Sequence, residues 1–247
     1  MKKLLILLSS ITLMVSTISA ETITANYKVE FGIIGEIGIA NAKLTRDENS
    51  YEIDVELIAT GMAKTLSGNR KEHHISKGHI ENGMMVSDLY QVIKSYGSTT
   101  VNKVYTINHV DKTVTKEYKR WKNAKVKNDE KNTLSYYSKD DLLTLYFNLN
   151  KKITDKTVSN SYTFKAIGAE KQNGQTTVEI PDSSELGEFK DVLGDDTNNW
   201  FARAVINQDI FSSDKGELML RIGADGVTEK AVLKDLILFG DIRAQRI

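Results

Sequence analysis

The segment 217–247 constrains the fold more than any other part of the sequence. In Leu218–Ile222 every second side chain is aliphatic, and Asp225-Gly226 then interrupts the alternation. Val227–Leu233 and Leu236–Ile247 follow as further extended runs. Period-two alternation around an Asp-Gly pair is a strong signal for a β-hairpin. The sequence therefore predicts that the chain closes with an antiparallel meander whose last strand is bonded into a sheet.

The same alternation recurs upstream and predicts about ten to twelve strands in total. In Tyr51–Leu57, for example, apolar residues alternate with acidic ones, as in a strand with one buried and one solvated face. Further strands are expected at Ile23–Phe31, Ile37–Leu44, Met84–Tyr96, Thr99–Asn108, Thr113–Trp121, Val158–Ala166, Thr176–Ile180 and Trp200–Ile206. Asn69–Ile75 is interpreted as a polar edge strand, Gly78–Gly83 as a turn, and the charged segment Lys122–Lys131 as a solvated loop.

Helical spacing is confined to short segments. Met62 and Leu66 lie four residues apart and predict one or two helical turns. Leu142–Leu149 is almost wholly apolar, so this helix must lie in or over the core. Ser138 followed three residues later by Asp141 resembles a capping box and places the helix start at Ser138. We therefore expect an all-β domain with one or two short helices.

The first twenty residues have the layout of a secretory signal peptide. Lys2 and Lys3 precede the apolar run Leu4–Val15, and Ala20 supplies the small residue at a cleavage site. An uncleaved anchor is the alternative, but a run of about 12 residues is shorter than the ~20 that span a bilayer. We expect residues 1–20 to be removed and residues 21–247 to form a single exported, periplasmic domain.

Composition excludes several classes of protein. The 33 basic residues equal the 33 acidic residues, and no basic stripe is visible, which argues against a nucleic-acid partner. The chain has no cysteine, so it has no disulfide, thiol nucleophile or cysteine metal site. It has no second long apolar segment, so no transmembrane span is expected after signal cleavage. We also expect no cofactor.

Candidate catalytic and metal-binding residues form no recognised motif. The patterns Gly-x-Ser-x-Gly and His-Glu-x-x-His do not occur. Asp140-Asp141 lies at the expected helix start, where capping explains the carboxylates better than glycosidase chemistry. His73 and His79 would share one face of a strand and are the candidate metal ligands, but their spacing matches no ligand motif. We therefore predict no metal site.

The acidic stretch Asp182–Asp196 follows the single proline. Leu186, Phe189 and Leu193 within it have the spacing of a short amphipathic helix. Asp195–Asn199 is rich in oxygen ligands but lacks EF-hand spacing, so it is interpreted as a solvated turn. Whether this stretch binds an ion stays open.

Four stretches carry a family resemblance: Tyr27–Phe31 with Ala40-Asn41-Ala42 after it, Thr60–Leu66, Asp141–Phe147 and Phe239–Ala244. Together they resemble a family of exported bacterial proteins known as domain of unknown function 3108 (DUF3108). The resemblance covers most of residues 21–247, and it implies an exported β-rich fold but no established activity. Its layout is similar to that of periplasmic half-barrels that carry lipoproteins or lipids.

These observations predict a curved antiparallel sheet or open β-barrel with a helix packed in its mouth. We expect a non-catalytic periplasmic binding or carrier protein for an apolar or lipid-like ligand. The candidate lining residues are Met62, Leu66, Met84, Leu142, Leu145, Tyr146 and Leu149. One alternative is a structural or interaction module of the cell envelope that recruits a protein partner through the edge Asn69–Lys77. The other is an envelope hydrolase with converging carboxylates or histidines.

Overall fold

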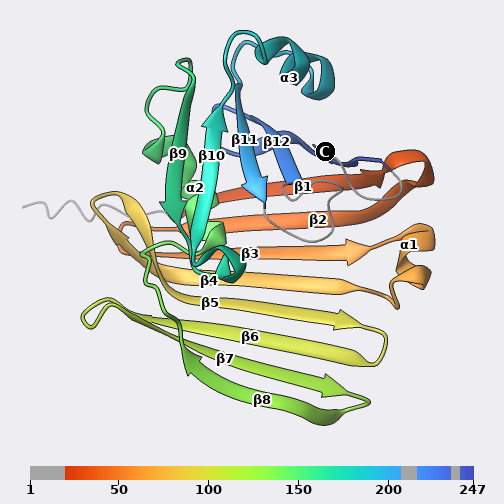
Figure 1. Ribbon diagram of the computed structural model, residues 1–247, viewed down its shortest axis with the longest axis vertical. Helices are drawn as coiled ribbons and strands as arrows, with labels where there is room; N and C mark the ends of the chain where they lie inside the picture. Colours follow the sequence, from red (N-terminus) through yellow and green to blue (C-terminus); the bar gives the residue numbers. More distant parts are fainter. Residues whose placement is uncertain (1–19, 207–215, 235–239) are drawn as a thin grey trace, which may run out of the picture.

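The fold, taken from a computed structural model, is one continuous antiparallel sheet (Figure 1). The structure describes residues 20–206, 216–234 and 240–247. The first eight strands are β1 (Glu21–Phe31), β2 (Gly35–Arg46), β3 (Ser50–Ala59), β4 (Lys71–Glu81), β5 (Met84–Tyr96), β6 (Thr99–Asn108), β7 (Thr113–Lys122) and β8 (Lys125–Thr133). The other six are β9 (Asn160–Lys165), β10 (Gln175–Ile180), β11 (Trp200–Ile206), β12 (Gly216–Ile222), β13 (Thr228–Leu233) and β14 (Ile242–Arg246).

Nearly every strand pairs with its neighbour in the chain. The spatial order is β8-β7-β6-β5-β4-β3-β2-β1-β14-β13-β12-β11-β10-β9. The exception is β8 and β9, which follow one another in the chain but lie at opposite ends of this order. β14 joins the two halves by pairing with β1 as well as with β13. The strand twist accumulates over so many strands that the sheet curls. In Figure 1, β9–β12 therefore run across the direction of β1–β8, so that the fold is the expected curved antiparallel sheet.

Three α-helices accompany the sheet: α1 (Gly61–Leu66), α2 (Leu142–Lys152) and α3 (Leu186–Leu193). Among the described residues, no helix is long and apolar enough to cross a membrane. The predicted number of elements was too low, since the described chain contains fourteen strands and three α-helices. The helical turns predicted around Met62 and within the acidic stretch are confirmed as α1 and α3.

Helix α2 packs between the two halves of the curled sheet. Leu145 and Leu149 belong to a buried cluster with β10, β11 and β12. Leu143 and Phe147 pack against a second cluster from β2, β3 and β5. Burying each such side chain contributes about 1.5–3 kcal/mol. The prediction that this apolar helix lies in the mouth of the curved sheet is therefore confirmed.

Helix α3 covers the other face of β11–β13. Its Phe189 and Leu193 pack against Phe201 and Met219, whereas the neighbouring Ala202 belongs to the cluster around α2. Successive side chains of a strand point to opposite faces, so α2 and α3 lie on opposite sides of these strands. The acidic stretch thus folds onto the sheet through its apolar residues.

Two interpretations of polar segments were wrong. Asn69–Lys77 is not an edge, because β4 is hydrogen-bonded to β3 on one side and β5 on the other. Gly78–Gly83 is not a turn throughout, since β4 continues to Glu81 and only Asn82 and Gly83 reverse the chain. The polar composition of β4 misled the interpretation because ion pairs with neighbouring strands accommodate its charges.

Lys122–Lys131 is not a loop either. It contains most of β8, which runs on to Thr133, pairs along β7 and forms one edge of the sheet in the described chain. Asn123 and Ala124 make the tight turn before it with φ of 51° and 58°, as hairpin turns with two left-handed residues require. Nearly all side chains of β8 are exposed, so its sequence shows no alternation. Main-chain hydrogen bonds define this strand instead.

Candidate functional site

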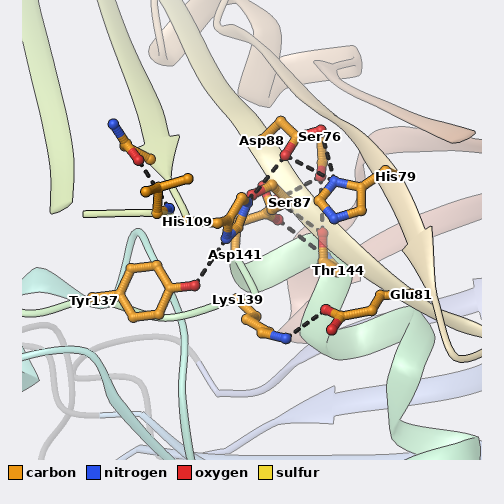
Figure 2. A network of polar contacts seen from close by, with 12 residues as sticks. Ser76, His79, Glu81, Ser87, Asp88, His109, Tyr137, Lys139, Asp141 and Thr144 are labelled. Atoms are coloured by element: carbon orange, nitrogen blue, oxygen red, sulfur yellow. Dashed lines mark hydrogen bonds and ion pairs between the residues drawn. The ribbon is translucent and has the colours of Figure 1, made fainter. Parts of the chain in front are cut away.

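A buried polar centre holds the start of α2 against the sheet (Figure 2). Asp141 is fully buried and caps the helix, with one carboxylate oxygen accepting hydrogen bonds from the main-chain nitrogens of Leu143 (2.7 Å) and Thr144 (3.0 Å). The other oxygen accepts from the hydroxyls of Ser76 (2.5 Å) and Thr144 (2.9 Å). The Tyr51 hydroxyl lies 2.8 Å from that of Thr144. This network joins α2 to β3 and β4.

The predicted capping box is corrected by this arrangement. Asp141, rather than Ser138, is the N-cap, and the helix begins at Leu142. Ser138 donates to the carbonyl of Lys165 (2.6 Å) and so fixes the segment before the helix. Asp140 accepts a hydrogen bond from Asn148 and forms an ion pair with Lys152. The interpretation of this acidic pair as a helix-capping feature is confirmed for Asp141.

A cavity of about 570 Å³ lies next to this end of α2. Its apolar lining comes from Tyr90, Val92, Tyr105 and Leu142, and Val205 contributes from the other half of the sheet. The rings of Tyr90 and Tyr105 are stacked with centroids 5.6 Å apart. Burial raises the pKa of both tyrosines, so they stay neutral. The cavity therefore has an aromatic wall.

Charged side chains gather at one side of the cavity. Glu72 receives hydrogen bonds from Lys94 (2.7 Å) and His74 (3.2 Å). Burial alone would raise the pKa of Glu72, but the hydrogen bonds from His74 and Lys94 and the charge of Lys94 outweigh it and hold that pKa well below its usual range. Burial lowers the pKa of Lys103, whose Nζ lies 3.8 Å from Glu170. Three lysines, Lys94, Lys103 and Lys171, therefore line the cavity together with Glu170.

The structure separates the predicted lining residues. Leu142 borders the cavity. Leu145 and Leu149 are buried in the core on the β10–β12 side. Tyr146 is also internal, where its hydroxyl donates to Thr228 Oγ1 (2.9 Å). Their helical spacing is explained by core packing, which gives the same sequence pattern as a ligand pocket.

The three predicted methionine and leucine positions outside α2 lie elsewhere. Met62 and Leu66 are 71% and 79% exposed on α1, which Figure 1 shows beyond the end of the sheet, away from α2. Met84 is half-buried at the first position of β5. None of the three belongs to the lining of the 570 Å³ cavity. Apolar character alone could not distinguish an exposed helical turn from a cavity wall.

The two candidate histidines have different surroundings. His73 pairs with Asp54 across β3 and β4, with Nε2 2.9 Å from the carboxylate. His79 Nδ1 lies 3.0 Å from both oxygens of Asp88, which also lies 3.0 Å from His109 Nε2 (Figure 2). His73 and His79 therefore do not form one site.

Asp88 and His109 were not predicted from the sequence. They come from β5 and from the turn after β6, and this juxtaposition is visible only once the strand order is known. The oxygen-rich stretch Asp195–Asn199 has other partners: Lys190 forms an ion pair with Asp195, and Asp196 accepts from the main chain of Asn198.

Comparisons with known proteins identify a fold but no function. No family model matches this sequence, and no curated protein matches it. The chain is similar to the crystal structure of a β-barrel-like protein of domain of unknown function DUF1849 from Brucella abortus. That likeness has a TM-score of 0.53 and 12% identity, and it covers 93% of this chain and 96% of the other. At this identity the likeness shows the fold alone.

The resemblance to DUF3108 was wrong. No model of that family matches the sequence, and the similar structure carries a different domain of unknown function. The stretches that suggested DUF3108 are apolar strand and helix segments. Curled β-rich folds in general need such segments, so they do not identify one family.

Proposed function

We propose that the protein is a non-catalytic binding or carrier protein for a lipid-like amphiphile held in the cavity beside Leu142. The cavity carries this proposal. Its volume of about 570 Å³ falls within the range of about 300–1,000 Å³ that is usual for small-molecule sites. Its combination of aromatic and aliphatic walls with a few charged groups is also typical of such sites.

The lining supports a ligand with an apolar body and an anionic head. Tyr90, Val92 and Leu142 offer apolar surface to the body. Lys94 and Lys103 lie at the same cavity, and Lys103 bears a desolvation cost that lowers its pKa. An anionic group beside Lys103 would offset that cost, because a nearby opposite charge favours the charged form.

A second depression is larger but fits this proposal less well. It measures about 690 Å³ and is bordered by polar residues of β1–β3 such as Asn41, Glu52 and Asp54. Glu52 and Asp54 flank the buried Ile53, and Asn41 pairs with Glu56 of the same strand, so these residues lie on the face of the sheet away from α2. A polar, acidic surface does not favour an apolar or anionic ligand.

The proposed location of the protein is the periplasm. It rests on the positive start, apolar run and small residue of the segment 1–20, of which residues 1–19 lie outside the described structure. A carrier for a lipid-like molecule is useful in an aqueous compartment between membranes. Sequencing the amino terminus of the protein recovered from the periplasm tests this location, and a chain that retains residues 1–20 would contradict it.

Titration with a fluorescent long-chain carboxylate tests the binding function. We expect saturable uptake of the probe by the purified protein. Leu142→Trp places a larger side chain at the cavity and should weaken uptake at least tenfold. The matched control is Met62→Trp on the exposed α1, which should leave uptake unchanged. Native mass spectrometry reports the number of probes bound to each chain.

Absence of saturable uptake would contradict the proposal. An equal loss in the Leu142 and Met62 variants would also contradict it, because Met62 does not line the cavity. Circular dichroism and thermal unfolding of both variants establish that they fold. Leu142 is partly exposed, so a tryptophan there has room to avoid disrupting the core.

A further inference from the structure

We propose that His79, Asp88 and His109 bind a divalent transition-metal ion of the zinc class. One ligand atom from each residue lies within 4.8 Å of the others. His79 presents Nδ1 and His109 presents Nε2, each 3.0 Å from Asp88 Oδ1 (Figure 2). Two imidazole nitrogens and one carboxylate form a recognised ligand set for zinc, with a further position open for water.

The position of Asp88 depends on an irregularity in the sheet. Lys77 pairs with Leu89 and Gly78 pairs with Ser87, so Asp88 is an extra residue without a partner across the ladder. Such a bulge re-aims a side chain, and bulges are enriched beside functional sites. Here the bulge directs the Asp88 carboxylate to both histidines. Regular pairing would not leave this residue unopposed.

His109 lies in a turn that the Asn108 side chain holds together by hydrogen bonds. Asn108 Oδ1 accepts from the main-chain nitrogens of Val110 and Asp111, both at 3.0 Å. The Asn108 side chain also donates to the Asp111 carboxylate (2.9 Å). These bonds fix the turn that carries His109. Pre-organised ligands lose less conformational entropy when a metal binds.

Tyr137 supplies an outer contact to the site. Its hydroxyl lies 2.8 Å from His109 Nδ1, the ring nitrogen that faces away from Asp88. Without a metal, His109 Nε2 donates to the carbonyl of Ser87 (3.0 Å), so a neutral ring accepts from Tyr137 at Nδ1. Metal binding at Nε2 moves the ring hydrogen to Nδ1, where it donates to the Tyr137 oxygen. Outer contacts of this kind orient metal-bound histidines.

The ligand chemistry selects the class of ion. Imidazole suits zinc, copper and nickel, whereas calcium and magnesium prefer sites made of oxygen atoms. The side chains of His79 and Asp88 are 43% and 47% exposed, so water reaches the open side. The pair between His73, on the same strand as His79, and Asp54 on β3 has similar exposure but only one histidine, which makes it a matched control.

Metal titration of the purified protein, free of any polyhistidine tag, tests the proposal. We expect one Zn²⁺ per chain in competition with a chromophoric chelator. Asp88→Asn and His109→Gln should each weaken binding by more than about tenfold, whereas His73→Gln should leave it within about twofold. Tyr137→Phe should weaken it about tenfold without lowering the thermal unfolding temperature of the metal-free protein. A stability loss without an affinity loss would identify Tyr137 as merely structural.

An experiment on the unmodified protein guards against variants that do not fold. The chain has four histidines, and their imidazole protons can be followed by NMR. Zn²⁺ should shift the signals of His79 and His109 while leaving those of His73 and His74 in place. The proposal is overturned if Zn²⁺ does not bind, or if it shifts the His73 or His74 signals instead. It is also overturned if Asp88→Asn and His109→Gln bind as tightly as the wild type.

Discussion

Asp141 and Glu72 are both withdrawn from solvent, but their pKa values move in opposite directions. Burial raises the pKa of Asp141 and is offset only in part by hydrogen bonds from Ser76 and Thr144. At Glu72 burial acts in the same direction, but hydrogen bonds from His74 and Lys94 and the charge of Lys94 reverse it. Neutral hydroxyls can satisfy a carboxylate, whereas a cationic partner also stabilises its charge.

The difference corresponds to two roles. Asp141 lies inside the protein and ties a helix to the sheet, so it belongs to the scaffold. Glu72 pairs with Lys94 beside an open cavity and so fixes the position of that lysine in the cavity lining. We therefore expect variants at Asp141 to change stability foremost. Variants around Glu72 should affect the pH dependence of stability and the choice of ligand.

The largest expected effect comes from Asp141→Ala. It removes the helix cap and leaves the buried hydroxyls of Ser76 and Thr144 without their acceptor, so we expect a loss of about 2–4 kcal/mol in the free energy of unfolding. Asp141→Asn keeps an acceptor for the helix nitrogens and should lose less. Urea denaturation measures both. Equal losses in the two variants would show that the hydrogen bonds accepted by the cap contribute nothing to stability.

A smaller effect is expected at Glu72, whose contribution to stability should depend on pH in the opposite direction to that of Asp141. Glu72→Gln should cost about 1–2 kcal/mol at pH 7 because a charge-assisted hydrogen-bond network is weakened. Since the folded pKa of Glu72 is lowered, this difference is full above about pH 4.5 and shrinks as the pH falls further. Urea denaturation at pH 7 and pH 3 checks it.

Asp141 should follow the reverse trend. Its folded pKa is raised, so the folded state retains the proton longer than the unfolded state. The stability of the wild type relative to Asp141→Asn should therefore fall as the pH rises above about 3.8. Parallel pH profiles for the Asp141 and Glu72 variants would erase the contrast between the two carboxylates.

The smallest expected effect concerns the cavity charge. Lys103→Met should weaken binding of the long-chain carboxylate probe about fivefold, equivalent to about 1 kcal/mol for a partly exposed ion pair. Lys119→Met is the matched control, because Lys119 pairs with Asp129 on β8, outside the cavity lining. Uncharged long-chain probes should not distinguish the two variants. If they do, Lys103 acts through packing.

The fold was predictable where one face of a strand is buried. The alternation in Tyr51–Leu57 belongs to a strand in which Tyr51 and Ile53 are buried. Trp200–Ile206 is apolar at nearly every position, because α2 and α3 cover its two faces, and it is also a strand. Helix α2 was found because a continuous apolar run can only be internal. By contrast, β8 has hardly any buried face, and the main-chain pairing that defines it leaves no mark on side-chain composition.

The candidate sites were less predictable, because long-range pairing creates them. Leu142 was found through its apolar helix, but the cavity also needs Tyr90 and Tyr105 from adjacent strands. His79 was noted, whereas Asp88 depends on a bulge and His109 on a distant turn. A local sequence pattern contains neither the register of two strands nor the irregularity that re-aims one side chain.

The pairing of β1 with β14 has a consequence for the order of assembly. Tyr27 lies opposite Arg246, and the nitrogen of Ile247 donates to the carbonyl of Asn26 (2.9 Å). As synthesis proceeds from the amino end, hairpins β1–β8 can form early, while β1 waits for a partner made more than two hundred residues later. Contacts so remote in sequence slow folding. A nascent chain should thus stay unfinished until β14 has been made.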